Sequence, residues 1–263
     1  MELNKIYNEN CLNTMDRMPD NFIDLVVTSP PYDTIRNYEG YSFNFDEIAK
    51  ELFRVVKIGG VVVWVVADKI INGSQTGTSF KQALFFKELG FLLHDTMIYK
   101  KRNPAPRPSN VRYVPSFEYM FILSKIQKPK TINLIKDVPR IHYVNNKTVG
   151  VRDKNGKLTY KRYSTKGNYK LRNNVWEYKT GLYHSAKERY IFEHPAVFPE
   201  KLAYDHILSW SNENDIVYDP FMGSGTTAKA AVITKRNYIG SEIAKKYIQI
   251  ANKRLKKLEN TLF

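Results

Sequence analysis

The sequence has few of the features that mark secreted, metal-bound or membrane proteins. It contains one cysteine, Cys11, which excludes an internal disulfide and a cluster of thiolate zinc ligands. No apolar run approaches the roughly 20 residues that a membrane-spanning helix needs. The first five residues lack the basic and then apolar order of a signal peptide. Together these absences predict a cytoplasmic protein that does not span a membrane.

The five histidines show no spacing that would bind a metal. None has a second histidine four residues away, and none stands near a cysteine and acidic residues in the pattern of a ligand set. We therefore expect no metal site.

Positive charge is concentrated in the middle of the chain. The formal net charge is +15, and residues 97–190 hold 22 Lys and Arg against 5 Asp and Glu, a net +17. The same segment contains 10 of the 18 tyrosines. Basic side chains interleaved with aromatic ones favour binding to a nucleic acid, whose phosphates and bases they complement. An acidic protein partner and a membrane surface are the alternatives that charge alone leaves open.

Apolar segments rich in β-branched residues alternate with segments of helical periodicity. The strand candidates are 22–27, 61–66, 91–98, 117–123, 215–218 and 237–240. The helix candidates are 46–57, 78–89, 226–235 and 244–258. The first helix is expected to stop at Gly59-Gly60 and the second to open with Thr78 as its cap. This alternation predicts an α/β fold with a doubly wound, mostly parallel sheet of the Rossmann type.

The alternation fails between residues 125 and 175. This window is rich in Lys and Arg, and glycines 150, 156 and 167 interrupt it. The tetrapeptide 153–156, Asp-Lys-Asn-Gly, predicts a turn, and 158–161 a hairpin strand after it. We expect a small basic module inserted into the α/β core.

A glycine-rich loop follows the strand candidate 215–218. The hexapeptide 223–228, Gly-Ser-Gly-Thr-Thr-Ala, fits the dinucleotide-binding pattern, in which glycines let a ligand approach the backbone at the start of a helix. Glu242 ends the next strand, where a carboxylate can accept hydrogen bonds from ribose hydroxyls. The pattern alone also fits a nicotinamide cofactor. Its position argues against a dehydrogenase, because only 38 residues follow Gly225 and the sheet must be completed by earlier strands.

A second loop, Ser29-Pro30-Pro31-Tyr32, follows the strand candidate 22–27 at the end where α/β sheets place their ligands. The prolines fix the backbone and lack N–H donors, so carbonyls there can accept hydrogen bonds from a ligand. The Ser29 hydroxyl and the Pro30 carbonyl could together hold the two protons of an exocyclic amine. Tyr32 offers a flat face on which a base flipped out of a duplex could stack.

Together the two loops resemble the signature motifs of the amino (N4-cytosine or N6-adenine) DNA methyltransferases, and the resemblance covers nearly the whole chain. Residues 21–32 resemble the catalytic motif with its lead-in strand. Residues 219–227 resemble the S-adenosylmethionine loop, and 240–242 the strand end whose acid binds the ribose. The catalytic motif precedes the cofactor motif, as in the β group. The resemblance implies S-adenosylmethionine as cofactor and double-stranded DNA, with base flipping, as substrate.

Two further segments extend the resemblance. Residues 194–202 resemble the segment beside the methionine moiety of the cofactor, and Asn10-Cys11-Leu12 stands where the family has Asp-Cys-Leu, near the adenine. The implied catalytic residues are Ser29, Pro30, Pro31 and Tyr32. The implied cofactor-binding residues are Asn10, Phe198, Asp219, Phe221, Gly223, Ser224, Gly225, Thr226, Thr227 and Glu242. The implied domains are a catalytic half, 1–124, a target-recognition insertion, 125–175, and a cofactor-binding half, 176–263.

The identity of Ser29 bears on the target base. Family members with serine at this position are mostly cytosine-N4 enzymes, and aspartate mostly marks adenine-N6 enzymes. The resemblance therefore predicts N4-methylcytosine, with N6-methyladenine made by the same mechanism as the alternative. A non-catalytic nucleic-acid-binding protein on this fold is a further alternative. For a methyltransferase, the resemblance points to a restriction-modification setting, in which a cognate restriction endonuclease and a homodimer are the candidate partners.

Overall fold

The computed structural model describes residues 1–31, 43–106, 111–186, 188–194 and 197–262. Contacts divide the chain into two compact units, Met1–Asn133 with Asn174–Phe263, and Leu134–Asn173. In the described residues we find no helix that is both long and apolar enough to cross a membrane.

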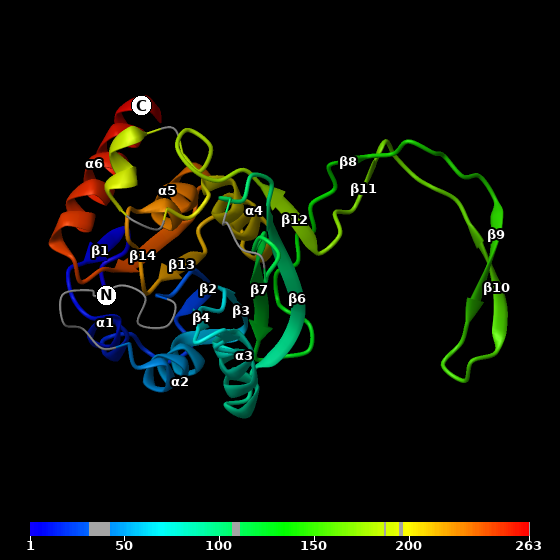
Figure 1. Cartoon of the computed structure of the whole chain (residues 1–263), viewed down its shortest axis with the longest axis horizontal. Coiled ribbons are helices and arrows are strands. Elements are labelled where there is room, and N and C mark those ends of the chain that lie inside the picture. Colours follow the sequence, from blue (N-terminus) through cyan, green and yellow to red (C-terminus); the bar gives the residue numbers. More distant parts are fainter. Residues whose placement is uncertain (32–42, 107–110, 187, 195–196, 263) are drawn as a thin grey trace. The chain divides into compact units, whose positions relative to one another are not determined.

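A mixed sheet of eight strands forms the centre of the larger unit, in the order β1-β14-β13-β2-β3-β7-β6-β12 (Figure 1). Neighbouring strands run parallel except that β7 is antiparallel to both β3 and β6. The strands are β1 (Lys5–Tyr7), β2 (Ile23–Thr28), β3 (Val56–Val66), β6 (Leu92–Lys101), β7 (Phe117–Ser124), β12 (Val175–Tyr178), β13 (Ile216–Asp219) and β14 (Asn237–Ser241).

Helices cover both faces of this sheet, so its central strands are buried on both sides. Figure 1 shows α1 (Cys11–Asp16), α2 (Phe45–Val55) and α3 (Thr78–Glu88) on one face. The other face carries α4 (Glu200–Trp210), α5 (Thr226–Ile233) and α6 (Lys245–Leu262), with the 3₁₀ helix η1 (Arg189–Glu193) packed against α6. The continuous apolar runs of β2 and β3 therefore fill the interior, and the predicted doubly wound α/β fold is confirmed.

Two details of the prediction were wrong. The helix expected over 46–57 ends at Val55, and β3 begins at the next residue, so Gly59 and Gly60 lie inside a strand. Gly60 has no room for a side chain there, because a Cβ would lie 2.9 Å from the Asp24 carbonyl oxygen. The cap of α3 is Gly77, in the left-handed conformation at φ 66°, and Thr78 is the first helical residue.

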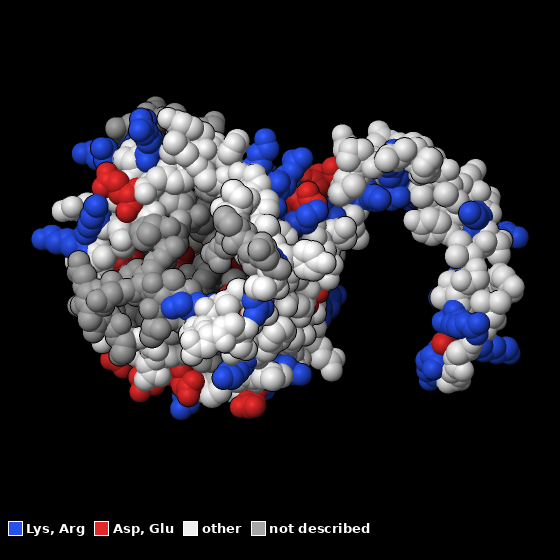
Figure 2. Space-filling view, in the orientation of Figure 1, with Lys and Arg blue, Asp and Glu red and all other residues white. Residues whose placement is uncertain are grey.

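The smaller unit, Leu134–Asn173, contains short antiparallel ribbons. Strands β9 (Lys147–Arg152) and β10 (Leu158–Tyr163) form a hairpin, and β8 (Val138–Pro139) pairs with β11 (Tyr169–Lys170). Almost all of its side chains are exposed, and Figure 2 shows Lys and Arg gathered on the hairpin. The Asp153 carboxylate accepts hydrogen bonds from the backbone N–H groups of Asn155 and Lys157, at 2.9 and 3.0 Å, and so closes the predicted turn.

A neutral histidine is buried where β12, β7 and α4 meet. The ring of His206 lies 4.7 Å from that of Trp176, and its Nε2 lies 3.2 Å from the Met120 sulfur. Its Nδ1 has no hydrogen-bond partner among the described residues. Burial lowers the pKa of His206 to about 3, against a slight opposing effect of Asp205. Trp176 thus packs into the core of the larger unit.

This histidine predicts an acid-sensitive step in stability. In the unfolded chain His206 takes up a proton below its ordinary pKa of 6.5. In the folded protein it stays neutral down to about pH 3. The free energy of unfolding should therefore fall as the pH drops, by up to about 1.4 kcal/mol per pH unit from this residue. Urea denaturation of the wild type and of His206→Gln at several pH values would measure the difference in slope.

The exposed His142, in the smaller unit, provides the control. His142→Gln should keep the wild-type slope. Equal slopes for His206→Gln and the wild type would contradict a buried neutral imidazole.

Candidate active site

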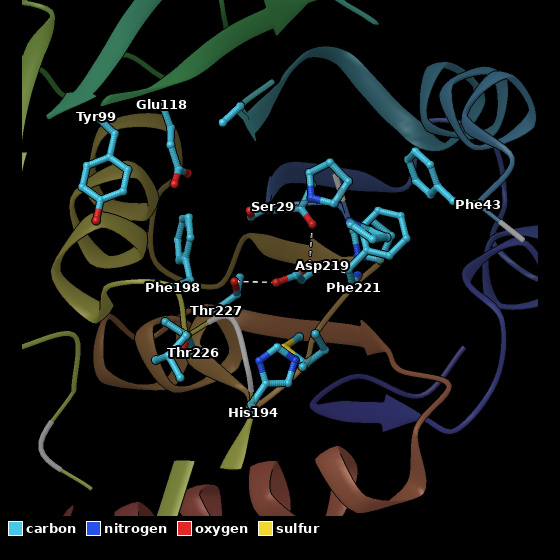
Figure 3. Close-up of a pocket in the computed structure, with 18 of the residues that line it drawn as sticks. Ser29, Phe43, Tyr99, Glu118, His194, Phe198, Asp219, Phe221, Thr226 and Thr227 are labelled. Atoms are coloured by element: carbon cyan, nitrogen blue, oxygen red, sulfur yellow. Dashed lines mark hydrogen bonds between the residues drawn. The ribbon is translucent and has the colours of Figure 1, made fainter. Parts of the chain in front are cut away.

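Two adjacent parallel strands, β2 and β13, deliver the two predicted loops to the same edge of the sheet. Asp219, the last residue of β13, links them. Its carboxylate accepts hydrogen bonds of 2.7 Å from the hydroxyls of Thr28, at the end of β2, and Thr227, on α5. It also accepts the Phe221 backbone N–H at 3.0 Å (Figure 3). Burial raises the pKa of Asp219, and these donors partly offset that effect.

The two loop glycines are required by conformation and by packing inside the protein. Gly223 has φ +52°, and a Cβ there would lie 2.9 Å from the His194 ring nitrogen Nε2. Gly225 has φ +80° and caps α5, and its Cβ would lie 2.9 Å from that of Ala251 on α6. His194 itself packs against the Tyr247 ring, at 4.3 Å between centroids. The loop is therefore shaped by its neighbours before any ligand binds.

Glu242 lies directly after β14 with its carboxylate held by backbone donors. One oxygen accepts the Gly223 N–H and the other the Ala244 N–H, each at 2.8 Å. Burial raises the pKa of Glu242, although these N–H donors stabilise its charged form. Each carboxylate oxygen keeps a further lone pair that can accept a hydrogen bond from a hydroxyl of a ligand.

A buried group of charges supports the loop from behind. Arg254, on α6, donates to the Ser224 carbonyl at 3.1 Å and to the Thr226 hydroxyl at 3.0 Å. Its guanidinium is fully buried and also pairs with Glu200 at the start of α4. Lys229 bonds the same Glu200 carboxylate at 2.9 Å and that of Glu188 at 2.6 Å. These charged side chains connect α4 and α6 to the loop.

These elements enclose a cavity of about 1580 Å³. Fourteen site residues are predicted from the sequence, and Gly225 and Tyr32 are the two that the cavity lining does not include. Gly225 packs against α6, and Tyr32 lies outside the described residues. The lining contains Asn10, Ser29, Pro30, Pro31, Phe198, Asp219, Phe221, Gly223, Ser224, Thr226, Thr227 and Glu242. Within the described residues, no group of acidic, histidine or cysteine side chains is arranged to hold a metal ion.

Several cavity residues were not predicted as site residues. Glu118, at the start of β7, pairs with Lys101 of β6 at 2.7 Å. Tyr99 has a buried hydroxyl with no partner among the described residues, and burial raises its pKa, so it remains a donor. In Figure 3, Glu118 and Phe198 lie on one side of Ser29, with Phe221 on the other. A glutamate beginning an apolar strand is the signal that could have identified Glu118.

The cavity suits an adenosine-containing cofactor. Glu242 offers acceptors for the hydroxyls of a ribose, while Phe221 and Ile243 offer apolar surface. Cys11 adds to that surface, because burial raises the pKa of its thiol to about 12 and keeps it neutral. Asn10 lines the cavity, and its side chain also caps α1 by accepting the Leu12 N–H at 2.9 Å. These features fit a nucleotide cofactor bound to a Rossmann-like α/β fold.

Comparison with known proteins gives the family. Residues 23–253 match the N6/N4 DNA methylase family. The orphan methyltransferase M.BamHII of Bacillus amyloliquefaciens is 56% identical over 244 residues, which cover 92% of this chain and 91% of the relative.

Solved structures share this fold. The cytosine-N4-specific PvuII DNA methyltransferase has a TM-score of 0.68 at 20% identity, over 94% of this chain and 84% of its own. The M1.HpyAVI complex with S-adenosylmethionine has a TM-score of 0.61 at 25% identity, over 95% and 98%.

The chain therefore belongs to the N6/N4 DNA methylase family, as an amino-methyltransferase of DNA with the β-group order of motifs. S-adenosylmethionine is its cofactor.

The support behind the loop makes Arg254 a residue on which cofactor binding should depend. Arg254→Met removes both hydrogen bonds to the loop and leaves Glu200 with Lys229 alone. We expect the free energy of unfolding to fall by about 3–5 kcal/mol. We expect cofactor affinity, measured by calorimetry below the melting temperature, to fall by roughly tenfold or more. Arg254→Lys should retain an intermediate affinity, because it keeps the charge but not the planar group.

Lys246, on the same helix, is the matched control, because its pair with Glu193 is exposed. Lys246→Met should change the free energy of unfolding by less than about 1 kcal/mol. Wild-type cofactor affinity in Arg254→Met would show that the loop does not need this support.

Proposed function

We propose that the enzyme methylates the N4 amine of cytosine in double-stranded DNA, on a base rotated out of the helix. The observation that carries this proposal is the position of Ser29 and Pro30. They follow β2, the neighbour of β13, and they line the cavity that also contains the cofactor loop. In this family, serine at the first motif position mostly accompanies cytosine-N4 methylation. Adenine N6 is the alternative target, because the same acceptors could hold its amine.

These residues are assigned to hold the target amine and to make its nitrogen nucleophilic. The Ser29 hydroxyl and the Pro30 carbonyl accept hydrogen bonds from the two N–H groups of the amine, which draws the nitrogen lone pair out of conjugation with the ring. When bound, S-adenosylmethionine supplies a methyl group on a positively charged sulfur. Transfer of that methyl group to the nitrogen would leave a neutral thioether on the cofactor, and the extra amine proton would leave to water. Tyr32, outside the described residues, is assigned to stack on the base.

The roles of the cofactor residues follow from the same cavity. We assign Glu242 to the ribose hydroxyls, with Phe221 and Asn10 beside the adenine. We assign Phe198 and the 223–227 loop to the methionine part of the cofactor. The buried Asp219 is assigned to hold the loop against β2 through Thr28 and Thr227.

The basic insertion, predicted at 125–175, is proposed to recognise the DNA target, and the compact unit Leu134–Asn173 supports this. The unit holds 11 Lys and Arg and 2 Asp. Asp137 pairs with Arg172, and Asp153 accepts hydrogen bonds in the turn. Two acids offset only a small part of the positive charge of the 11 Lys and Arg. A two-stranded ribbon such as β9–β10 is one of the elements that fit the major groove.

The biological setting is part of the same proposal. The name of the relative M.BamHII describes it as an orphan methyltransferase, which supports an enzyme that acts without a paired restriction endonuclease. A homodimer stays a prediction. We place the enzyme in the cytoplasm, with its DNA substrate.

The product identifies the target base. DNA modified by the enzyme, digested to nucleosides and analysed by mass spectrometry, should contain N4-methylcytosine. Ser29→Ala should lower turnover by about 100-fold, the scale of removing one hydrogen bond to a reacting group, with unchanged cofactor affinity. N6-methyladenine as the sole product would overturn the choice of base. The absence of any methylated base would favour the non-catalytic alternative.

The charge of the smaller unit should appear in the salt dependence of DNA binding. Changing Lys154, Lys157 and Lys161 of the hairpin to Gln should lower the slope of log affinity against log salt by about 0.9 for each DNA phosphate that these lysines neutralise. Cofactor affinity should not change. A matched triple substitution on α6, of Lys246, Lys253 and Lys256 to Gln, removes the same charge and should leave the slope nearly unaltered. A lower slope for the α6 variant and an unaltered slope for the hairpin variant would indicate that DNA binds to α6 instead.

A further inference from the structure

A short hairpin in the larger unit exposes two adjacent isoleucines. Strands β4 (Ile70–Ile71) and β5 (Ser74–Gln75) pair in antiparallel fashion around the turn Asn72-Gly73. Both turn residues have positive φ, 49° and 75°, as in the tight type I′ turn that Asn-Gly favours. Ile70 is 41% and Ile71 45% exposed. Because successive strand residues point to opposite sides, the hairpin has an apolar side chain on each face.

The hairpin stands at the edge of the catalytic cavity. It follows β3, the strand that pairs with β2, and so projects from the carboxyl end of the sheet near the Ser29 loop. Ile70 and Gln75 line the same cavity as Ser29 and Pro30. The side chain of Ile70 thus belongs both to the cavity lining and to the protein surface, which places the hairpin at the opening through which a base would enter.

The hairpin is held at its base and at its tip. The Asp68 carboxylate accepts hydrogen bonds from the Ser79 backbone N–H, at 2.9 Å, and from its hydroxyl, at 2.7 Å, which ties the start of the hairpin to α3. At the turn, the Arg112 guanidinium donates to the Gly73 carbonyl. Because the hairpin is fixed at both ends, it can keep its conformation when it contacts the stacked bases of a duplex.

Three cations belong to the surroundings of the hairpin. Lys69 and Lys81 line the cavity beside the hairpin, and Arg112 brings a third positive charge to its tip. Apolar side chains beside Lys and Arg complement DNA, whose phosphates lie outside its apolar base stack. A membrane surface or an apolar protein partner would not need the neighbouring cavity.

We propose that the β4–β5 hairpin is a wedge that inserts Ile70 and Ile71 into the DNA at the position vacated by the flipped base. This inference rests on the proposed function, because it requires a base rotated out of a duplex. Rotation leaves a gap and costs the pairing and stacking of the target base. Apolar side chains placed between base steps keep such a gap open and slow the return of the base.

The test compares a disrupted wedge with a control substitution of an exposed isoleucine far from the cavity. The variant is Ile70→Ser with Ile71→Ser. The control is Ile58→Ser, because Ile58 is 67% exposed at the opposite end of β3. On a matched duplex carrying the site that the wild-type enzyme modifies, single-turnover methylation by the double variant should be about 10- to 100-fold slower. The control should match the wild type, and Ile70→Leu with Ile71→Leu should retain most of the rate.

A mismatched substrate separates a wedge from a merely structural hairpin. A mismatch opposite the target base lowers the cost of flipping, so it should restore the double variant to within about threefold of the wild type. Fluorescence of 2-aminopurine placed beside the target base should report a smaller flipped population for the variant on matched DNA only.

Three results would overturn the wedge. A wild-type rate for the double variant on matched DNA would show that the isoleucines are not needed. An equal loss on matched and mismatched DNA would assign the hairpin a structural role in the cavity. If the wild-type enzyme methylates no duplex, the proposed function itself fails, and the wedge with it.

Discussion

The architecture of the active site depends on one buried carboxylate. Asp219 accepts hydrogen bonds from the end of β2, from the first turn of α5 and from the cofactor loop itself. Thr28 and Asp219 are 191 residues apart in the chain, and their 2.7 Å hydrogen bond fixes the distance between the amine-binding loop and the cofactor loop. Because the group is buried, each donor offsets part of a large desolvation cost, and removing any one of them would leave an acceptor uncompensated. The two motifs therefore form one rigid unit, in which a displacement of about 1 Å would spoil the alignment of an attack.

Much of this arrangement follows from local patterns. The apolar runs 22–27 and 215–218 predicted the strands that became β2 and β13, because strands buried on both faces must be continuously apolar. The positive φ of Gly223 and Gly225 likewise agrees with the residue type that the loop requires. The packing reason for these glycines could not be predicted, since His194 and Ala251 approach them from distant parts of the chain. An apolar run does not indicate whether its strand is parallel or antiparallel to its neighbours. The antiparallel orientation of β7 could therefore not be predicted from the sequence.

Charged side chains show where sequence patterns reach their limit. On an amphipathic helix such as α6 an arginine is normally solvated, and only the folded structure places Arg254 in the interior with Glu200. In the smaller unit the charges are almost all exposed, and its acids are engaged locally. The same residue types thus stabilise the core in one unit and remain available to a polyanion in the other.

The pairing of β1 with β14 has a consequence for synthesis of the protein. Residues 5–7 leave the ribosome more than 200 residues before their partners, residues 239–241. The Glu242 backbone N–H donates to the Tyr7 carbonyl at 3.0 Å, and the Asn8 side chain donates to the Glu242 carbonyl, also at 3.0 Å. The nascent chain must keep its first strand unpaired until residue 242 has emerged, because a pairing between such distant segments has a high entropic cost and forms late. The wall of the cofactor pocket is therefore completed only after residue 242 has been translated, and a chain that stops before it lacks this part of the site.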